Sequence, residues 1–241
     1  MSLPRIDSPI YNLTLPLSKK EIRYRPFTVK EQRNLLMALE ASDIATMQTN
    51  IEQILNNCTL TEGIDISKLP LIDVEYYFLH LRAKSVGEVV ENQYKCNNEV
   101  DGKECGNLMN VKFNLTELQV ITDDSVADKI MVTDKILVKL KYPDYSMLKR
   151  IEDADNISDF AFSLLVESIE YIHDGEQFYY ASETSPEELM EFVESLNTEQ
   201  FNKLQEFFDK LPTLKKDIHV KCSKCGFEHN IPVEGLESFF D

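Results

Sequence analysis

The sequence predicts an α+β fold built from a small hairpin, a helical region, a four-cysteine zinc ribbon and a mixed α/β insertion. Three observations predict it. Strand-like and helix-like hydrophobic periods both occur along the 241 residues. Helix-capping signals appear in both halves of the chain. Two cysteine-glycine pairs flanked by strand-like segments lie more than a hundred residues apart. The predicted parts are residues 1–87 for the hairpin and helices, 88–114 and 215–234 for the ribbon, and 115–214 for the insertion.

The N-terminal part begins with a predicted hairpin. Residues 11–17 and 21–27, YNLTLPL and EIRYRPF, each alternate between apolar and polar side chains, and a polar SKK turn separates them. Thr28 and Glu31 have the Thr-x-x-Glu spacing of a capping box, so a helix is predicted over residues 29–42.

Two further helices are predicted over residues 44–58 and 69–90. Cys58 belongs to the first, where we expect it to be a small buried hydrophobic side chain. The second is rich in Leu, Tyr and Phe at helical spacing, so one of its faces packs in the core or binds a partner. Core packing is the preferred interpretation, because aromatic stripes usually face the core. This face consists of Ile72, Tyr76, Leu79 and Ala83.

The insertion is predicted to alternate strands and helices. Residues 129–143 read as two strands, and a helical region follows from Tyr145 to about Glu170. Residues 171–180 form a predicted hairpin whose turn is the Asp174-Gly175 pair.

The last two helices of the insertion carry start signals. Ser185 is a predicted N-cap and Pro186 a first-turn proline for the helix over residues 187–196. In the same way, Thr198 is predicted to cap the helix over residues 199–211.

Cys222 and Cys225 form the strongest functional motif in the sequence. Two residues separate them, Gly226 follows, and the strand-like segments 217–221 and 227–233 flank the motif. Two thiols on a tight turn of this kind usually bind a metal ion, and the glycine lets the backbone turn sharply.

Cys96 and Cys105 are predicted to supply the other two ligands that a tetrahedral zinc ion requires. Gly106 repeats the cysteine-glycine pattern, and the strand-like segments 89–95 and 108–115 flank the pair. The eight residues between the two thiols, NNEVDGKE, weaken the signal and are expected to form a bulging polar loop. The sequence therefore predicts one structural Zn²⁺ held by two distant hairpins, with unligated surface cysteines as the alternative.

Catalysis is not favoured by the sequence. A catalytic zinc site keeps an open position and often uses histidine or carboxylate ligands. His219 and His229 lie near the cysteine turn, but four thiols already satisfy the metal, so we expect these histidines to make ordinary surface or packing contacts. No phosphate-binding, nucleophile-elbow or zinc-protease motif occurs, and seven glycines leave little material for a phosphate loop. A metal-dependent hydrolase is the less favoured alternative.

The overall charge bears on the partners. A net charge of −17 repels nucleic-acid phosphates and anionic membrane surfaces, so we expect neither as a partner. A zinc-ribbon nucleic-acid-binding regulator stays an alternative because a small basic cluster lies beside the cysteine turn, composed of Lys215, Lys216, Lys221 and Lys224.

No apolar run approaches the roughly 20 residues that cross a bilayer. A secretion signal is also missing at the N-terminus, and the five cysteines fit a reducing cytoplasm better than a disulfide framework.

Several segments together resemble the baseplate hub proteins of T-even-type contractile-tailed bacteriophages. These are MSLPRIDSPIYNLTLP, IRYRPFTVKEQRNLLMALE, LPLIDVEYYFLHLRAKSVGE and the cysteine turn. The likeness extends from Pro4 to the closing IPVEGLESFF, and its most specific parts are Arg25-Pro26-Phe27 and residues 79–88.

This family includes a hub subunit and a hub assembly catalyst. The resemblance implies a non-enzymatic assembly role in the cytoplasm of an infected bacterium, with other baseplate hub proteins as partners. The virion tail baseplate is a second location that the resemblance allows. The length of the chain favours the assembly factor over the subunit.

Overall fold

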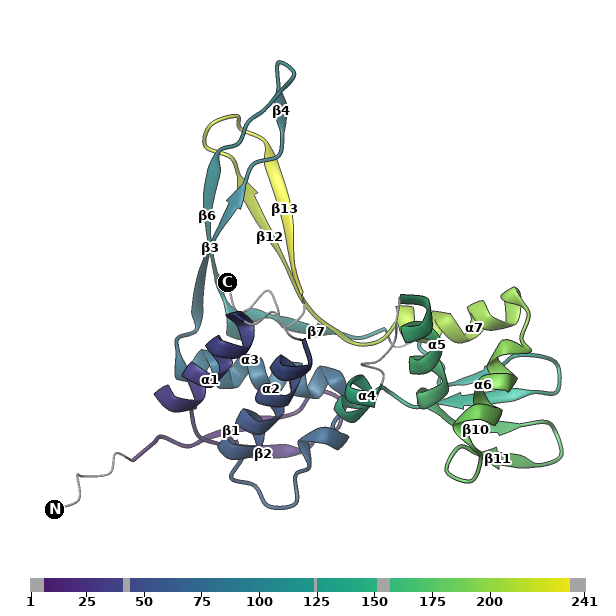
Figure 1. Ribbon diagram of the computed structural model, residues 1–241. Helices are drawn as coiled ribbons and strands as arrows, with labels where there is room; N and C mark the ends of the chain where they lie inside the picture. Colours follow the sequence, from purple (N-terminus) through teal and green to yellow (C-terminus); the bar gives the residue numbers. More distant parts are fainter. Residues whose placement is uncertain (1–6, 41–43, 124, 151–156, 235–241) are drawn as a thin grey trace. The chain divides into compact units, whose positions relative to one another are not determined.

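The computed structural model describes residues 7–40, 44–123, 125–150 and 157–234. The chain divides into two compact units (Figure 1). Unit 1 contains three segments of the chain and unit 2 contains two. The segments of unit 1 are Met1–Ile64, Ile72–Ile121 and Thr213–Asp241, and those of unit 2 are Asp65–Leu71 and Thr122–Pro212. The described part is mixed α/β, as the sequence predicts.

Unit 1 begins with the predicted hairpin. Strand β1 (Tyr11–Thr14) pairs antiparallel with β2 (Glu21–Tyr24). The turn between them is held by Asp73, a fully buried residue whose carboxylate accepts hydrogen bonds from two backbone N–H groups. The Leu17 nitrogen lies 2.7 Å from Oδ1 and the Ser18 nitrogen 2.8 Å from Oδ2. A carboxylate remote in sequence therefore fixes the position of the hairpin.

Three helices follow the hairpin: α1 (Val29–Glu40), α2 (Ile44–Cys58) and α3 (Leu71–Ser85). The predicted capping box at the start of α1 is confirmed. The Thr28 backbone N–H donates to Glu31 Oε2 at 2.6 Å, and the Glu31 backbone N–H donates to Thr28 Oγ1 at 3.5 Å.

Glu31 also forms an ion pair. Arg25 Nη2 lies 2.8 Å from Glu31 Oε1 and Arg25 Nη1 3.0 Å from Oε2, so the contact is bidentate. The Arg25 guanidinium lowers the pKa of Glu31 to about 2, with further help from Thr28. Cys58 is fully buried beside this pair, as predicted, and burial raises the pKa of its thiol to about 12.

The helix predicted over residues 69–90 is shorter in the structure. It ends at Ser85, and strand β3 (Val89–Lys95) begins four residues later. Gly87 lies between them at φ 144°, a conformation that an α-helix does not contain. The β-branched Val89 and Val90 then continue as a strand. The prediction was wrong here because helical periodicity was extended past a glycine.

Two hairpins lie side by side in unit 1 (Figure 1). In the first, β3 pairs antiparallel with β6 (Leu108–Asn114). In the second, β12 (Thr213–Lys221) pairs with β13 (Glu228–Glu234). A short strand, β7 (Gln119–Ile121), pairs with the other edge of β12, which gives the sheet order β13-β12-β7.

The polar loop expected between Cys96 and Cys105 contains regular structure. Strands β4 (Glu99–Val100) and β5 (Lys103–Glu104) pair antiparallel across a two-residue turn. Asp101 at φ 52° and Gly102 at φ 75° occupy this turn. Asp-Gly favours a type I′ hairpin turn because both central residues need positive φ. The loop between Cys96 and Cys105 is thus a small hairpin of its own.

The core of unit 1 lies where the two hairpins meet helix α3. Alternate residues of β3 and β6 face inward, as the alternating burial along both strands shows. The buried side chains of this core are Ile72, Leu79, Ala83, Val90, Phe113, Leu115, Leu118, Leu214 and Val233. Because these side chains come from two segments of unit 1, Ile72–Ile121 and Thr213–Asp241, the core depends on residues remote in sequence.

Unit 2 contains a four-stranded antiparallel sheet with the order β11-β10-β9-β8. Its strands are β8 (Lys129–Met131), β9 (Leu137–Leu140), β10 (Ile169–His173) and β11 (Phe178–Tyr180). The two strands expected within residues 129–143 and the hairpin with the Asp-Gly turn are confirmed. Gly175 of that turn has φ 98°.

Four α-helices complete unit 2 in its described part: α4 (Tyr145–Arg150), α5 (Ile157–Ser168), α6 (Pro186–Glu194) and α7 (Thr198–Asp209). The predicted N-cap Ser185 is confirmed, with a full capping box to Glu188. The sheet and helices share a core of Val132, Val138, Leu140, Leu165, Val166, Ile169, Ile172, Leu189, Val193, Leu204 and Phe207.

The cap of α7 differs from the prediction by one residue. Asn197 is the N-cap, and Thr198 is the first residue of the helix. The Asn197 Oδ1 accepts from the Gln200 N–H at 2.9 Å, and the Gln200 Oε1 accepts from the Asn197 N–H at 2.9 Å. Asparagine and threonine are both good caps, and Gln200 stands at the third helical position only when Asn197 caps.

Candidate metal centre

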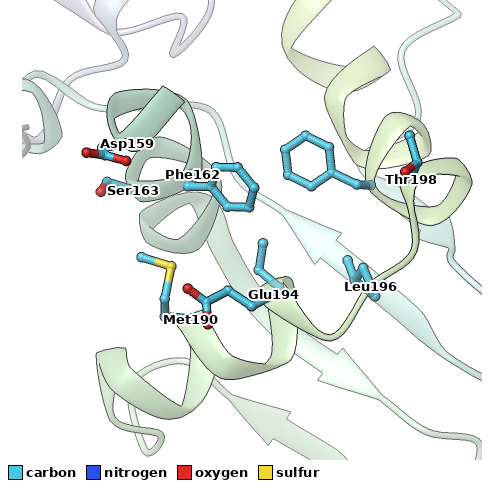
Figure 2. Close-up of a pocket in the computed structure, with 9 residues that line it drawn as sticks. Asp159, Phe162, Ser163, Met190, Glu194, Leu196 and Thr198 are labelled. Atoms are coloured by element: carbon cyan, nitrogen blue, oxygen red, sulfur yellow. The ribbon is translucent and has the colours of Figure 1, made fainter. Parts of the chain in front are cut away.

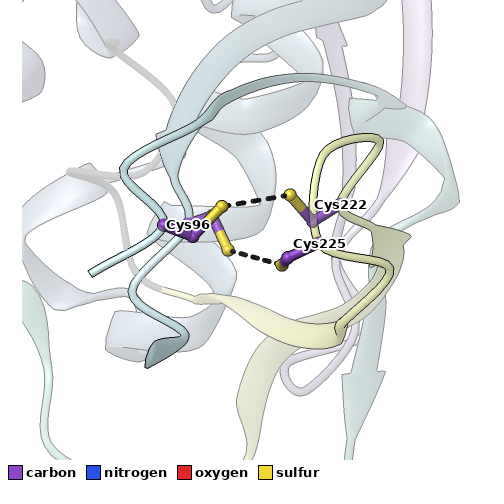
Figure 3. A group of neighbouring side chains, drawn as sticks. Cys96, Cys222 and Cys225 are labelled. Carbon is purple, nitrogen blue, oxygen red and sulfur yellow. Dashed lines mark hydrogen bonds between the residues drawn. The ribbon is translucent and has the colours of Figure 1, made fainter. Parts of the chain in front are cut away.

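The structure brings the four cysteines of the two hairpins together. Cys96 follows β3, Cys105 precedes β6, and Cys222 and Cys225 lie in the turn between β12 and β13. Their four sulfur atoms all lie within 4.8 Å of one another. Figure 3 shows the side chain of Cys96 on the first hairpin and those of Cys222 and Cys225 on the second pointing toward one another. Residues more than a hundred positions apart thus form one cluster.

The distances between the sulfur atoms fit a tetrahedral metal site. Cys96 Sγ lies 3.6 Å from Cys225 Sγ, and Cys105 Sγ lies 3.9 Å from Cys222 Sγ. A zinc ion with Zn–S bonds of about 2.3 Å places its sulfur ligands about 3.8 Å apart. A disulfide would need about 2.0 Å. The four thiols are therefore separate and could hold one metal ion.

The Cys222–Cys225 turn is closed by its own backbone. The Gly226 N–H donates to the Cys222 carbonyl at 2.9 Å, and the Cys222 N–H donates to the Phe227 carbonyl at 2.8 Å. Gly226 adopts φ 76°, where a side chain would be strained. This explains why glycine directly follows the second cysteine.

The Cys96–Cys105 half repeats the same backbone pattern despite its longer spacing. The Gly106 N–H donates to the Cys96 carbonyl at 3.0 Å, and the Cys96 N–H donates to the Asn107 carbonyl at 2.8 Å. Gly106 adopts φ 63°. The β4–β5 hairpin accommodates the additional residues outside this closed turn. The two halves of the cluster are thus equivalent in backbone geometry.

Each hairpin also places donors against the other. Asn98 Nδ2 lies 3.7 Å from Cys225 Sγ, and Asn107 Nδ2 lies 3.5 Å from Cys222 Sγ. The Lys224 ammonium donates to the Cys105 carbonyl at 2.9 Å. N–H donors stabilise thiolate ligands and fix their orientation. Nothing in the sequence pattern singled out these two asparagines.

The thiols have different affinities for protons. The backbone N–H of Cys225, with that of Lys224, lowers the pKa of Cys222 to about 6. Burial, with smaller contributions from the neighbouring thiols, raises the pKa of Cys96 to about 12. Four thiolates this close repel one another unless a cation lies between them, and a metal ion displaces the thiol protons when it binds. The donor set therefore fits a metal cation.

The two nearby histidines have different positions. His229 Nε2 lies 3.1 Å from Cys96 Sγ, and its half-buried ring lies edge-on to Phe227 at 4.8 Å between centroids. His219 is exposed. His229 thus contacts the cysteine cluster directly, whereas only an ordinary surface or packing contact was expected from the sequence. Its pairing position on β13, opposite Val220, directs it toward the first hairpin.

The basic cluster beside the turn makes local contacts. Lys216 forms an ion pair with Glu117, and Lys221 Nζ lies 3.5 Å from Glu228 Oε1. The Lys216 pair and the contact of Lys224 with the Cys105 carbonyl join the second hairpin to the first hairpin and the segment that follows it, whereas the Lys221 pair lies within the second hairpin.

The four residues of the α3 face lie at the unit 1 core. Ile72, Leu79 and Ala83 are at most 5% exposed. Tyr76 is half-buried and packs against the same core. The centroid of its ring lies 4.4 Å from the centroid of the His80 ring. Three of the four side chains are therefore unavailable at the surface of this unit, and partner binding stays a prediction that depends on Tyr76.

The sequence model of the family described as T4 bacteriophage base plate protein matches residues 8–241. The chain belongs to this family. The T4 base plate family resemblance drawn from the sequence is thereby confirmed. Over 232 residues the chain is 25% identical to the baseplate hub assembly protein gp26 of Enterobacteria phage T4. The alignment covers 96% of this chain and 98% of the T4 protein. No solved structure matches. Among the helices of the described residues, none combines the length and apolar character needed to span a membrane.

Proposed function

We propose that this chain is a non-enzymatic assembly protein of the phage baseplate hub, which acts through contacts with other hub proteins in the infected bacterial cytoplasm. One observation carries the proposal: the similarity covers 98% of a protein named for hub assembly. The assembly role is favoured over the hub subunit for the same reason. Whether the chain stays in the finished tail baseplate is a separate question, which the protein content of purified virions answers.

The proposal includes one structural Zn²⁺ bound by Cys96, Cys105, Cys222 and Cys225. Four thiolates in tetrahedral arrangement select zinc or iron–sulfur clusters among biological metals, and a single ion fits sulfur atoms about 3.8 Å apart. All four positions of such an ion are filled by protein ligands, so none is left for a substrate. The zinc would join the ends of the two hairpins and thereby fix the ribbon.

The base plate family membership favours this function over the two alternatives. A nucleic-acid-binding regulator would need positive charge, and three of the four lysines beside the cysteine turn are engaged: Lys216 with Glu117, Lys221 with Glu228 and Lys224 with a backbone carbonyl. A hydrolase would need an open metal position. Neither alternative has a specific supporting contact within the described residues.

A pull-down from infected cells tests the proposed function. The chain is expressed with an affinity tag in bacteria infected by a phage that lacks the native gene. We expect the tagged chain to restore plaque formation and to recover other baseplate hub proteins. The same tag on an unrelated acidic protein is the control. Recovery of no hub protein by a chain that restores plaques would overturn the proposal.

Tyr76→Ala tests the proposed partner-binding face. We expect this change to lower the free energy of unfolding by about 1–2 kcal/mol, because the half-buried ring packs on the core. Hub association should be unchanged once the variant is folded. Thermal melts and the same pull-down measure both quantities. Lost association with an unchanged melt would instead identify Tyr76 as an interface residue.

A further inference from the structure

Unit 2 contains a groove that the metal centre does not explain. It has a volume of about 540 Å³ and lies among α5, α6 and the start of α7 (Figure 2). Its apolar lining consists of Phe162, Met190, Val193, Leu196 and Phe201. The rings of Phe162 and Phe201 are stacked, with centroids 4.8 Å apart. This groove offers an apolar floor large enough for big side chains.

Carboxylates lie at the mouth of this groove. Asp159 and Glu194 are the exposed charged residues of its lining, and both are acidic. Two hydroxyl-bearing residues, Ser163 and Thr198, complete the polar part. Figure 2 shows the Glu194 carboxylate beside Met190, with the Asp159 carboxylate on the neighbouring helix. An apolar floor is thus combined with a negative rim.

The negative rim belongs to a strongly acidic unit. Residues 122–212 contain 21 Asp and Glu against eight Lys and Arg, a net charge of −13, while residues 65–71 contain one of each sign. Unit 2 therefore carries most of the −17 of the chain. Three further exposed glutamates, Glu187, Glu188 and Glu191, lie on α6 itself. A ligand that approaches this groove therefore meets a unit of net negative charge.

We propose that this acid-rimmed groove binds a basic, apolar-anchored segment of another baseplate hub protein. One or two large apolar side chains of the segment would fill the floor, as an amphipathic helix does in a groove. Lysine or arginine side chains beside them would pair with Asp159 and Glu194. This inference rests on the proposed function and names the chemistry of the partner.

The charge also selects against other occupants. A second copy of this chain carries the same −17 and would be repelled. A basic segment, in contrast, gains from the potential of the whole unit, which speeds its encounter with the groove and suppresses wrong partners. Binding through such charges should weaken as salt concentration rises.

Photo-crosslinking in infected cells tests the inference. The tagged full-length chain carries p-benzoylphenylalanine in place of Met190 in the groove. A matched control carries it in place of Asp134, an exposed residue in the turn between β8 and β9 of the same unit. We expect the Met190 variant to crosslink to one hub protein, at a segment rich in lysine or arginine. The Asp134 variant should give no such product.

Charge removal distinguishes the rim from the floor. Asp159→Asn and Glu194→Gln are added together to the Met190 crosslinking chain, because they keep side-chain size at exposed positions, and a thermal melt checks that the variant is folded. We expect the crosslinked fraction to fall about tenfold, with less dependence on salt. Unchanged crosslinking after this change would overturn the inference, as would crosslinking to a second copy or none above the control.

Failure of the inference is separable from failure of the proposed function. If hub proteins are recovered in the pull-down while the groove gives no specific crosslink, the assembly role stands and the groove is not the contact. If no hub protein is recovered at all, the proposed function itself fails.

Discussion

Replacing Cys105 with serine should abolish zinc binding and destabilise unit 1. Serine leaves three thiolates, so the four-coordinate set is broken. The metal would join Cys105 and Cys222 across 117 positions of sequence. Closing a loop of that length contributes about 4–5 kcal/mol in the chain-entropy treatment of a crosslink. Its loss should lower the melting temperature by roughly 10–20 °C for a chain of this size. Elemental analysis and thermal melts give the two results.

Cys58→Ala is the matched control for this experiment. Cys58 is fully buried beside Arg25, and it is not a member of the sulfur cluster. We expect this variant to retain one zinc per chain. Full zinc content in a Cys96→Ser/Cys105→Ser double variant would contradict the proposal that the two hairpins share one metal site. Cys222 and Cys225 would then have other ligands, with His229 the first candidate.

Asp73→Ala should destabilise unit 1 by about 3–5 kcal/mol. Each hydrogen bond to a charged acceptor contributes about 1.5–3 kcal/mol, and alanine leaves the backbone N–H groups of Leu17 and Ser18 without their acceptor. The effect should be strongest at the N-terminal hairpin, because the two hydrogen bonds to Asp73 join the turn of this hairpin to α3. Urea denaturation measures the free energy of unfolding, and hydrogen exchange at Leu17 and Ser18 measures the local effect.

Two variants bracket the Asp73 result. Asp73→Asn keeps one oxygen acceptor, so it should lose about half as much stability. Glu62→Ala changes an exposed acidic residue and should stay within about 0.5 kcal/mol of the original chain. If Asp73→Ala unfolds at the same urea concentration as Glu62→Ala, the two hydrogen bonds contribute nothing to stability.

The elements that could be predicted from the sequence have local causes. The capping box at Thr28, the N-cap at Ser185 and the Asp174-Gly175 turn depend on residues within four positions of one another. The strands on both sides of each cysteine pair could be predicted because apolar and polar residues alternate there with a period of two. The clustering of the four cysteines followed from a chemical requirement, since a metal with two thiol ligands needs others.

The features that could not be predicted depend on contacts between remote residues. His229 reaches Cys96 only because the second hairpin lies beside the first. Asp73 looks like an ordinary helical carboxylate until the hairpin turn packs on it. Residues 65–71 join unit 2 through the backbone: the Leu71 N–H donates to the Pro143 carbonyl and the Tyr145 N–H to the Leu69 carbonyl. No periodicity in these short segments indicates such partners.

The positions of the four cysteines along the sequence also determine when the cysteine cluster can form during synthesis on the ribosome. At about 5–20 residues per second, the 117 positions from Cys105 to Cys222 take roughly 6–23 seconds to synthesise. During that time the first hairpin has emerged without the second pair of thiols. The residues of unit 2 are all complete before Cys222 appears. The residues of the acidic unit are therefore synthesised first, and the capture of a metal ion by all four thiols would be a late event in the synthesis of the chain.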